Sequence, residues 1–118
     1  MSERPGNQLF DAYFTARDMR EVFCDAGRVQ AMLDVEAALA RAEARVGVIP
    51  QSAVASIEKA CRAELYDFSA LSEAIASAGN SAIPLVKALG KRIAAEDAEA
   101  ERYVHLGATS QDLSLIHI

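Results

Sequence analysis

The chain has 118 residues, enough for one small domain that buries about two-thirds of the surface of its unfolded form. It carries 12 Lys and Arg against 17 Asp and Glu, and these charges are interspersed, which disfavours binding to nucleic acid or to an anionic membrane. The polar N-terminus "MSERPGNQ" is not a secretory signal, and no apolar run approaches the ~20 residues of a membrane span. The composition therefore predicts a soluble cytoplasmic protein.

No segment alternates apolar and polar residues as a strand does, so the sequence predicts an all-α protein. Thr15 is expected to cap a short helix that runs to Phe23, and Asp25 is expected to begin a longer helix that ends at Val46. Apolar residues recur in this second helix at spacings of three and four, which predicts one narrow stripe facing another helix. The stripe consists of Met32, Val35, Leu39, Ala42 and Val46.

Turn and cap residues divide the rest of the chain into shorter helices. Gly47 is expected to end the long helix, and Pro50 suits the first turn of the next one because its missing N–H is not needed there. Asp67 is expected to cap a further helix that Gly79 ends. Pro84 then lies in the first turn of another helix. The following "AEDAEAERY" is expected to be a solvated connection or a frayed helix end.

The apolar side chains predict a core that is modest for the number of helices. Cys24 and Cys61 form no metal-binding pattern, so both are expected to be reduced and buried, with Val54 and Ile57 also turned inward. Packing roles are expected for Tyr13, Phe14 and Phe23. At ~25 cal/mol per Å² of apolar surface, the many buried alanines stabilise little. The chain is therefore expected to be a fragment or an obligate oligomer.

The segment "HLGATSQD" combines a helix-start pattern with groups that could bind an anion. Thr109 and Asp112 match a capping box in which Thr109 is the N-cap and Asp112 the third helical residue. Thr109 and Ser110 also offer hydroxyls beside the small residue Gly107, where backbone N–H groups attract carboxylates. His105 is either a donor to such an anion or part of a packed turn. Both interpretations are compatible with the pattern.

A second candidate is "SAGNSAIPLVKALG", where Asn80 and Ser81 precede a helix and Lys87 follows one to two turns later. Its amide and hydroxyl repeat the chemistry of the first segment, so two such sites predict a small polycarboxylate ligand. Arg17 and Arg20 are expected to form solvated surface pairs. The sequence lacks GxGxxG, P-loop, HExxH and GxSxG patterns, and its two cysteines have no metal-binding spacing.

Three stretches together carry a family resemblance. They are "NQLFDAYFTARDMREVFCDAGRVQAMLDVEAALARAEARVGVIP", "AGNSAIPLVKALGKR" and "YVHLGATSQD". Over residues 7–112 the chain resembles the N-terminal part of the bacterial 3-carboxy-cis,cis-muconate cycloisomerases. These enzymes form a branch of the fumarase, aspartase, argininosuccinate lyase and adenylosuccinate lyase superfamily. The resemblance implies the N-terminal helical domain of a fumarase/aspartase-type fold, truncated before the central helical bundle.

The resemblance also implies a function and an assembly. Members are three-domain homotetramers whose active sites form where three subunits meet, and this branch lactonises 3-carboxy-cis,cis-muconate in protocatechuate degradation without a cofactor. Thr109 and Ser110 are implied ligands of a substrate carboxylate, with His105 close by, and Asn80 stands where adenylosuccinate lyases have histidine. The general acid or base is a serine on a glycine-rich loop further along. No catalytic residue is therefore expected in this chain, which is expected to be inactive alone.

The end of the chain departs from this pattern. Residues 1–112 are expected to form the domain, whereas "LSLIHI" at 113–118 resembles a translated sequencing adapter and is expected to be a non-native tail. Two other functions stay open. One is another lyase of the superfamily, such as a C–N lyase like adenylosuccinate lyase, which would need a histidine in place of Asn80. The other is a non-enzymatic helical interaction module, which would leave the candidate ligand residues unexplained.

Overall fold

The computed structural model describes residues 10 and 12–114, which form helices joined by turns and contain no strand. The all-α prediction is confirmed. The elements are α2 (Arg17–Phe23), α3 (Asp25–Arg45), α4 (Gln51–Ala60), a 3-10 turn η1 (Ala63–Leu65), α5 (Phe68–Ala78), α6 (Ala82–Glu96), α7 (Ala98–Glu101) and α8 (Ser110–Ser114). Within the described residues, no helix is both long and apolar enough to cross a membrane.

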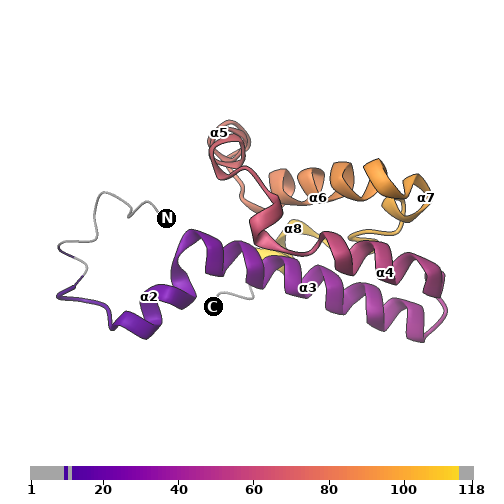
Figure 1. Ribbon diagram of the computed structural model, residues 1–118, viewed down its shortest axis with the longest axis horizontal. Helices are drawn as coiled ribbons and strands as arrows, with labels where there is room; N and C mark the ends of the chain where they lie inside the picture. The colour runs from indigo at the N-terminus through magenta and orange to yellow at the C-terminus, as the bar shows by residue number, and fades with distance from the viewer. Residues whose placement is uncertain (1–9, 11, 115–118) are drawn as a thin grey trace.

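The helices stack in two layers with the C-terminal helix between them (Figure 1). The long helix α3 packs against α4, and α4 in turn contacts α6 and α7. Helix α8 contacts both α6 and α3, while α5 packs on α6 at the outer edge and α2 projects from the start of α3. This arrangement brings the segment before α8 back to the middle of α3.

The helix ends follow the predicted local signals in most places. Asp67 caps α5 by accepting hydrogen bonds from two backbone N–H groups, and Gly79 ends that helix with φ 68°. Gly47, at φ 81°, follows the end of α3 as predicted. The predicted cap at Thr15 is wrong, because α2 begins after Ala16 without a side-chain cap. The N-cap of α3 is Cys24, whose sulfur accepts from an N–H group of the first turn.

The core lies where α3, α4, α6 and α8 meet. Its largest fully buried side chains are Leu33, Ile57, Leu89, Ile93 and Leu113. Val54, Ile57 and Cys61 are buried as predicted, and burial raises the pKa of the Cys61 thiol to about 12. Both cysteines are free, as expected, but Cys24 is only half-buried because it serves as a cap. At neutral pH the Cys61 thiol therefore stays protonated and acts as a small apolar residue.

The predicted apolar stripe of α3 is rotated from the buried face. The buried residues are Met32, Leu33, Glu36, Ala37 and Ala40. Of the predicted stripe, only Met32 is buried, while Val35 and Leu39 are half-buried, Ala42 is exposed and Val46 is 75% exposed. Alanines occur all around α3, so the spacing of its apolar residues does not show which face the neighbouring helices cover.

Two other expectations about packing are wrong. The "AEDAEAERY" segment contains the ordered helix α7, where Asp97 caps the first turn and also accepts a hydrogen bond from Ser56 at 2.9 Å. Tyr13 and Phe14 are 82% and 86% exposed, and Phe23 is also exposed, so they do not join the core. Tyr13 and Phe14 lie in the turn before α2, and α2 itself contains no buried residue.

The predicted boundary between domain and tail falls inside α8. Leu113 is 1% exposed and belongs to the core, whereas residues 115–118 lie outside the described part of the chain. The division into residues 1–112 and a tail at 113–118 stays a prediction.

Candidate functional site

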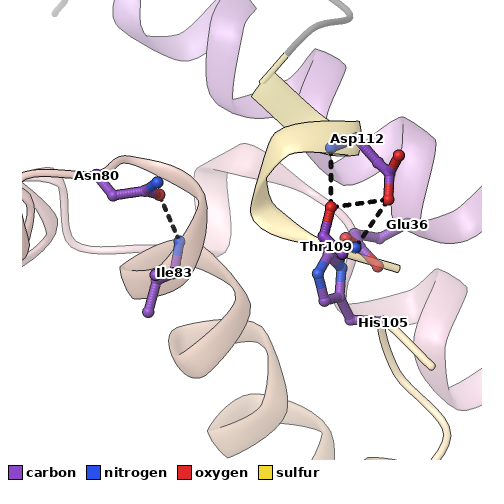
Figure 2. Close-up of polar contacts among 6 residues, drawn as sticks. All are labelled: Glu36, Asn80, Ile83, His105, Thr109 and Asp112. Carbon is purple, nitrogen blue, oxygen red and sulfur yellow. Dashed lines mark hydrogen bonds and ion pairs between the residues drawn. The ribbon is translucent and has the colours of Figure 1, made fainter. Parts of the chain in front are cut away.

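The start of α8 is organised by a reciprocal pair of hydrogen bonds (Figure 2). The backbone N–H of Thr109 donates to Asp112 Oδ2 at 2.9 Å, and the N–H of Asp112 donates to Thr109 Oγ1 at 3.4 Å. The Thr109 hydroxyl also donates to Asp112 Oδ2 at 3.0 Å. These donors hold the pKa of the Asp112 carboxyl below its ordinary value. The predicted capping box is confirmed.

The turn before this cap is held by a contact with α3. His105 Nδ1 makes a hydrogen bond with Glu36 Oε1, across 69 positions of sequence (Figure 2). Glu36 is 2% exposed, and the side chain of His105 is 17% exposed. His105 has φ 58°, a left-handed conformation that residues with a Cβ rarely adopt, and Gly107 follows with φ 74°. The chain therefore turns sharply between the buried pair and Thr109.

A cavity of ≈ 420 Å³ lies between this turn and α3, and we call it the acidic hollow. Its polar lining comes from Glu36, Glu43, His105 and Asp112, with aliphatic side chains between them. Glu36 Oε2 and Glu43 Oε1 are buried without a hydrogen-bond partner. Burial raises the pKa of the Glu36 carboxyl against the opposing effect of His105, and burial together with the charge of Glu36 raises the pKa of Glu43.

Asn80 and Ser81 occupy the start of α6, as predicted. Asn80 Oδ1 accepts hydrogen bonds from the backbone N–H groups of Ala82 at 2.8 Å and Ile83 at 3.1 Å. Ser81 is exposed at the N-cap position and makes no side-chain cap bond. Figure 2 shows a hydrogen bond between Asn80 and Ile83 of its own helix. Among the residues drawn, no hydrogen bond joins Asn80 to Thr109, His105 or Asp112. The convergence of the two segments on one ligand stays a prediction.

The remaining predicted positions are more scattered. Ser110 is the half-buried first residue of α8. Lys87 lines a different cavity of ≈ 680 Å³ between α5 and α6, which none of the five candidate ligand residues lines. Arg17 pairs with Glu21 at 4.0 Å, and both side chains are largely exposed, so the predicted surface pair is confirmed for Arg17. Arg20 makes no ion pair with another described residue, so the prediction is wrong there. In the described part of the chain, no cluster of three His, Cys, Asp or Glu residues could hold a metal ion.

Sequence reasoning missed the two carboxylates that α3 contributes. Glu36 lies one turn from Met32 and one turn from Ala40, both of them buried. This helical spacing indicates that Glu36 is on the buried face of α3. A glutamate at such a position needs a partner, but which residue supplies it depends on the elements that pack against α3. Glu43 lies two turns beyond Glu36 on the same side of the helix.

The comparisons with known proteins assign the chain to a family. A family model described as "Lyase" matches residues 12–116. The chain belongs to this lyase family. It is 76% identical over 112 residues to the 3-carboxy-cis,cis-muconate cycloisomerase of Pseudomonas aeruginosa, a match that covers 95% of this chain and 24% of that protein. By contrast, the adenylosuccinate lyase of Pyrococcus horikoshii, in a match covering 87% of this chain and 22% of that protein, is 35% identical over 103 residues.

The fold of this lyase-family chain also matches a solved structure. The crystal structure of 3-carboxy-cis,cis-muconate lactonizing enzyme from Pseudomonas putida aligns with a TM-score of 0.86 at 74% identity, over 91% of this chain and 24% of that one. The described helices thus have the fumarase/aspartase-type fold that the sequence predicts. The chain spans about a quarter of the length of these relatives.

Proposed function

We propose that this chain is the N-terminal part of a cofactor-independent cycloisomerase that lactonises 3-carboxy-cis,cis-muconate to 4-carboxymuconolactone. The observation that carries the proposal is the 76% identity with the Pseudomonas aeruginosa cycloisomerase over nearly the whole chain. The ordered turn and cap from His105 to Asp112 support it, because they give the candidate ligand residues a defined geometry.

The chemistry of lactonisation explains what this chain contributes. One substrate carboxylate adds across a double bond, and a proton is delivered to the neighbouring carbon, so negative charge accumulates on an enolised carboxylate. Hydrogen-bond donors fixed around that group stabilise the transition state. Thr109 and Ser110 supply hydroxyls for this purpose, and the Thr109 hydroxyl would leave Asp112 to do so.

The environment of Asn80 favours a cycloisomerase over a C–N lyase. Its side-chain oxygen is engaged by two backbone N–H groups of α6, which is a helix-capping role. An asparagine in this role does not transfer protons at neutral pH. With Ser81 beside it, Asn80 would contact a second substrate carboxylate through its amide N–H groups.

The same proposal includes a homotetramer in the cytoplasm whose active sites combine several subunits. Exposed aliphatic side chains support further packing partners for this region, since Val46 is 75% exposed, Val48 57% and Leu106 39%. The partner of the site itself would be a small polycarboxylate.

A chimera tests the function directly. Residues 1–112 of this chain replace the matching segment of the Pseudomonas putida cycloisomerase, to which the chain is 74% identical over 106 residues. We expect the chimera to consume 3-carboxy-cis,cis-muconate. The reaction is measured as the loss of the ultraviolet absorption of the substrate's conjugated diene. A chimera that folds and assembles like the parent enzyme but has no turnover would contradict the proposal.

Substitution within the chimera tests the ligand assignment. Ser110→Ala should lower kcat roughly 100-fold, because it removes one donor to the developing negative charge. Ser52→Ala is the matched control, since Ser52 is an exposed serine near the start of α4. Equal kcat values for the two variants would show that Ser110 is not a ligand of the substrate.

A further inference from the structure

The pair formed by Glu36 and His105 joins the core of the domain to the candidate ligand segment. Glu36 is 2% exposed on the inner face of α3, and one of its oxygens contacts His105 Nδ1 while Oε2 has no partner. A buried carboxylate is costly unless it is paired, so its presence here calls for a reason beyond packing. Among the described residues, the only side chain with a hydrogen bond to this carboxyl group is the imidazole of His105 (Figure 2).

The backbone of His105 shows why the turn needs such an anchor. Its φ of 58° lies in the left-handed region, which is unfavourable for a residue with a Cβ. Gly107 adopts φ 74° two residues later, and Thr109 then caps α8. His105 contacts Glu36 from this conformation, and the segment that carries Thr109 and Ser110 follows directly.

We propose that Glu36 is a positioning residue that fixes the orientation and tautomer of His105, so that Nε2 is the ring nitrogen offered to a substrate carboxylate beside Thr109 and Ser110. This inference rests on the proposed function. In the neutral imidazole, Nδ1–H donates to Glu36 and Nε2 carries the lone pair; when the ring is protonated, Nε2–H donates to the carboxylate. At many histidine sites, a hydrogen-bond acceptor at one ring nitrogen fixes the tautomer and therefore whether the other nitrogen carries a proton.

Glu43 provides a matched comparison on the same helix. It lies two turns after Glu36, lines the same acidic hollow and has a buried oxygen without a hydrogen-bond partner. It makes no hydrogen bond or ion pair with His105 among the described contacts. If removing any carboxylate from the acidic hollow were enough to alter the His105 tautomer or the activity, Glu43→Gln would alter them as well.

Nitrogen NMR of the whole 118-residue chain tests the tautomer without any turnover. His117, the other histidine, is replaced by Gln so that the single imidazole signal belongs to His105. We expect the neutral ring to be the Nδ1–H form in this parent, in Glu36→Gln, whose amide oxygen still accepts, and in Glu43→Gln. Glu36→Leu, which fills the space without an acceptor, should change to the Nε2–H form.

Two results would overturn the inference at this stage. One is an Nε2–H ring in the parent, which needs no variant to fold. The other is an unchanged Nδ1–H ring in a Glu36→Leu chain whose far-ultraviolet circular dichroism matches that of the parent.

Kinetics in the chimera then test the consequence for catalysis. Glu36→Leu should lower kcat/KM by about 10- to 100-fold, because small displacements of orienting groups have effects of this size. Glu36→Gln and Glu43→Gln should stay close to the unsubstituted chimera. If Glu36→Gln is as impaired as Glu36→Leu while it keeps the Nδ1–H ring, positioning is not the role of Glu36. An inactive unsubstituted chimera refutes the proposed function instead, and the NMR result still decides whether Glu36 orients His105.

Discussion

Two carboxyl groups on α3, that of the buried Glu36 and that of the half-buried Glu43, couple the stability of the chain to pH. Burial raises the pKa of Glu36 and of Glu43 above the ordinary value of 4.5. As the pH rises from 4.5 to each raised pKa, the folded state binds more protons than the unfolded state. The free energy of unfolding therefore falls across that window, which is the opposite of the behaviour of a salt-bridged carboxylate.

Glu43→Gln should remove one of these two contributions. Because glutamine does not ionise, the variant should gain stability relative to the parent as the pH rises from 4.5 to 7. Urea unfolding at both pH values measures the difference. Glu73→Gln, at an exposed position on α5, is the control and should show no such gain. An equal gain in both variants would assign the effect to net charge instead of burial.

Only side-chain contacts between residues close in sequence could be predicted. The bonds between Thr109 and Asp112 follow from a four-residue pattern, because both partners are fixed by the same turn of helix. The partner of His105 could not be predicted in this way. Glu36 lies 69 positions earlier, and only the packing of α8 against α3 brings the two together.

At the scale of elements, α3 carries two apolar faces, of which only one is buried by this chain. Leu33 is fully buried, whereas Val46 on the predicted stripe is 75% exposed. Alanines at Ala37 and Ala40 complete the buried face because they let neighbouring helices approach closely. In the stripe from Val35 to Val46, Val35 and Leu39 are half-buried, and only Ala42 and Val46 are exposed.

This difference predicts contrasting effects of two alanine substitutions, one within α3 and one at its C-cap. Leu33→Ala should lower the free energy of unfolding by about 2–5 kcal/mol, because it leaves a cavity in the core. Val46→Ala should change it by less than about 0.5 kcal/mol, because the side chain is mainly in water. Urea denaturation of both variants measures these values. Similar losses would mean that the predicted stripe is the packed face after all.

Helix limits were predictable where the signal is local and strong. The caps at Asp67 and Asn80 and the end at Gly79 depend on groups within four residues of the helix end. The short elements η1 and α7 were not predicted. Three- and four-residue segments have too little periodicity to identify, and α7 is held by packing against α4 and α6.

At the scale of the whole molecule, the core and α2 differ in how firmly they are held. Helix α2 contains no buried residue and projects from the start of α3 (Figure 1). The two helices meet closely at Gly27, where an added Cβ would lie 2.5 Å from the carbonyl oxygens of Glu21 and Val22. Such an overlap requires a backbone shift, and α2 can move with little loss of buried surface.

Gly27→Ala should therefore loosen α2 and leave the core intact. Amide hydrogen exchange over residues 17–23 should speed up by at least about tenfold, while exchange in α4 and α6 stays unchanged, since segments with few buried contacts open independently. A chain reduced to residues 24–118 keeps the Cys24 cap and should unfold within about 1 kcal/mol of the parent. In that shorter chain Gly27→Ala should no longer be destabilising, because the carbonyl groups it meets are gone. Faster exchange in α4 or α6 would instead show that the junction with α2 supports the core.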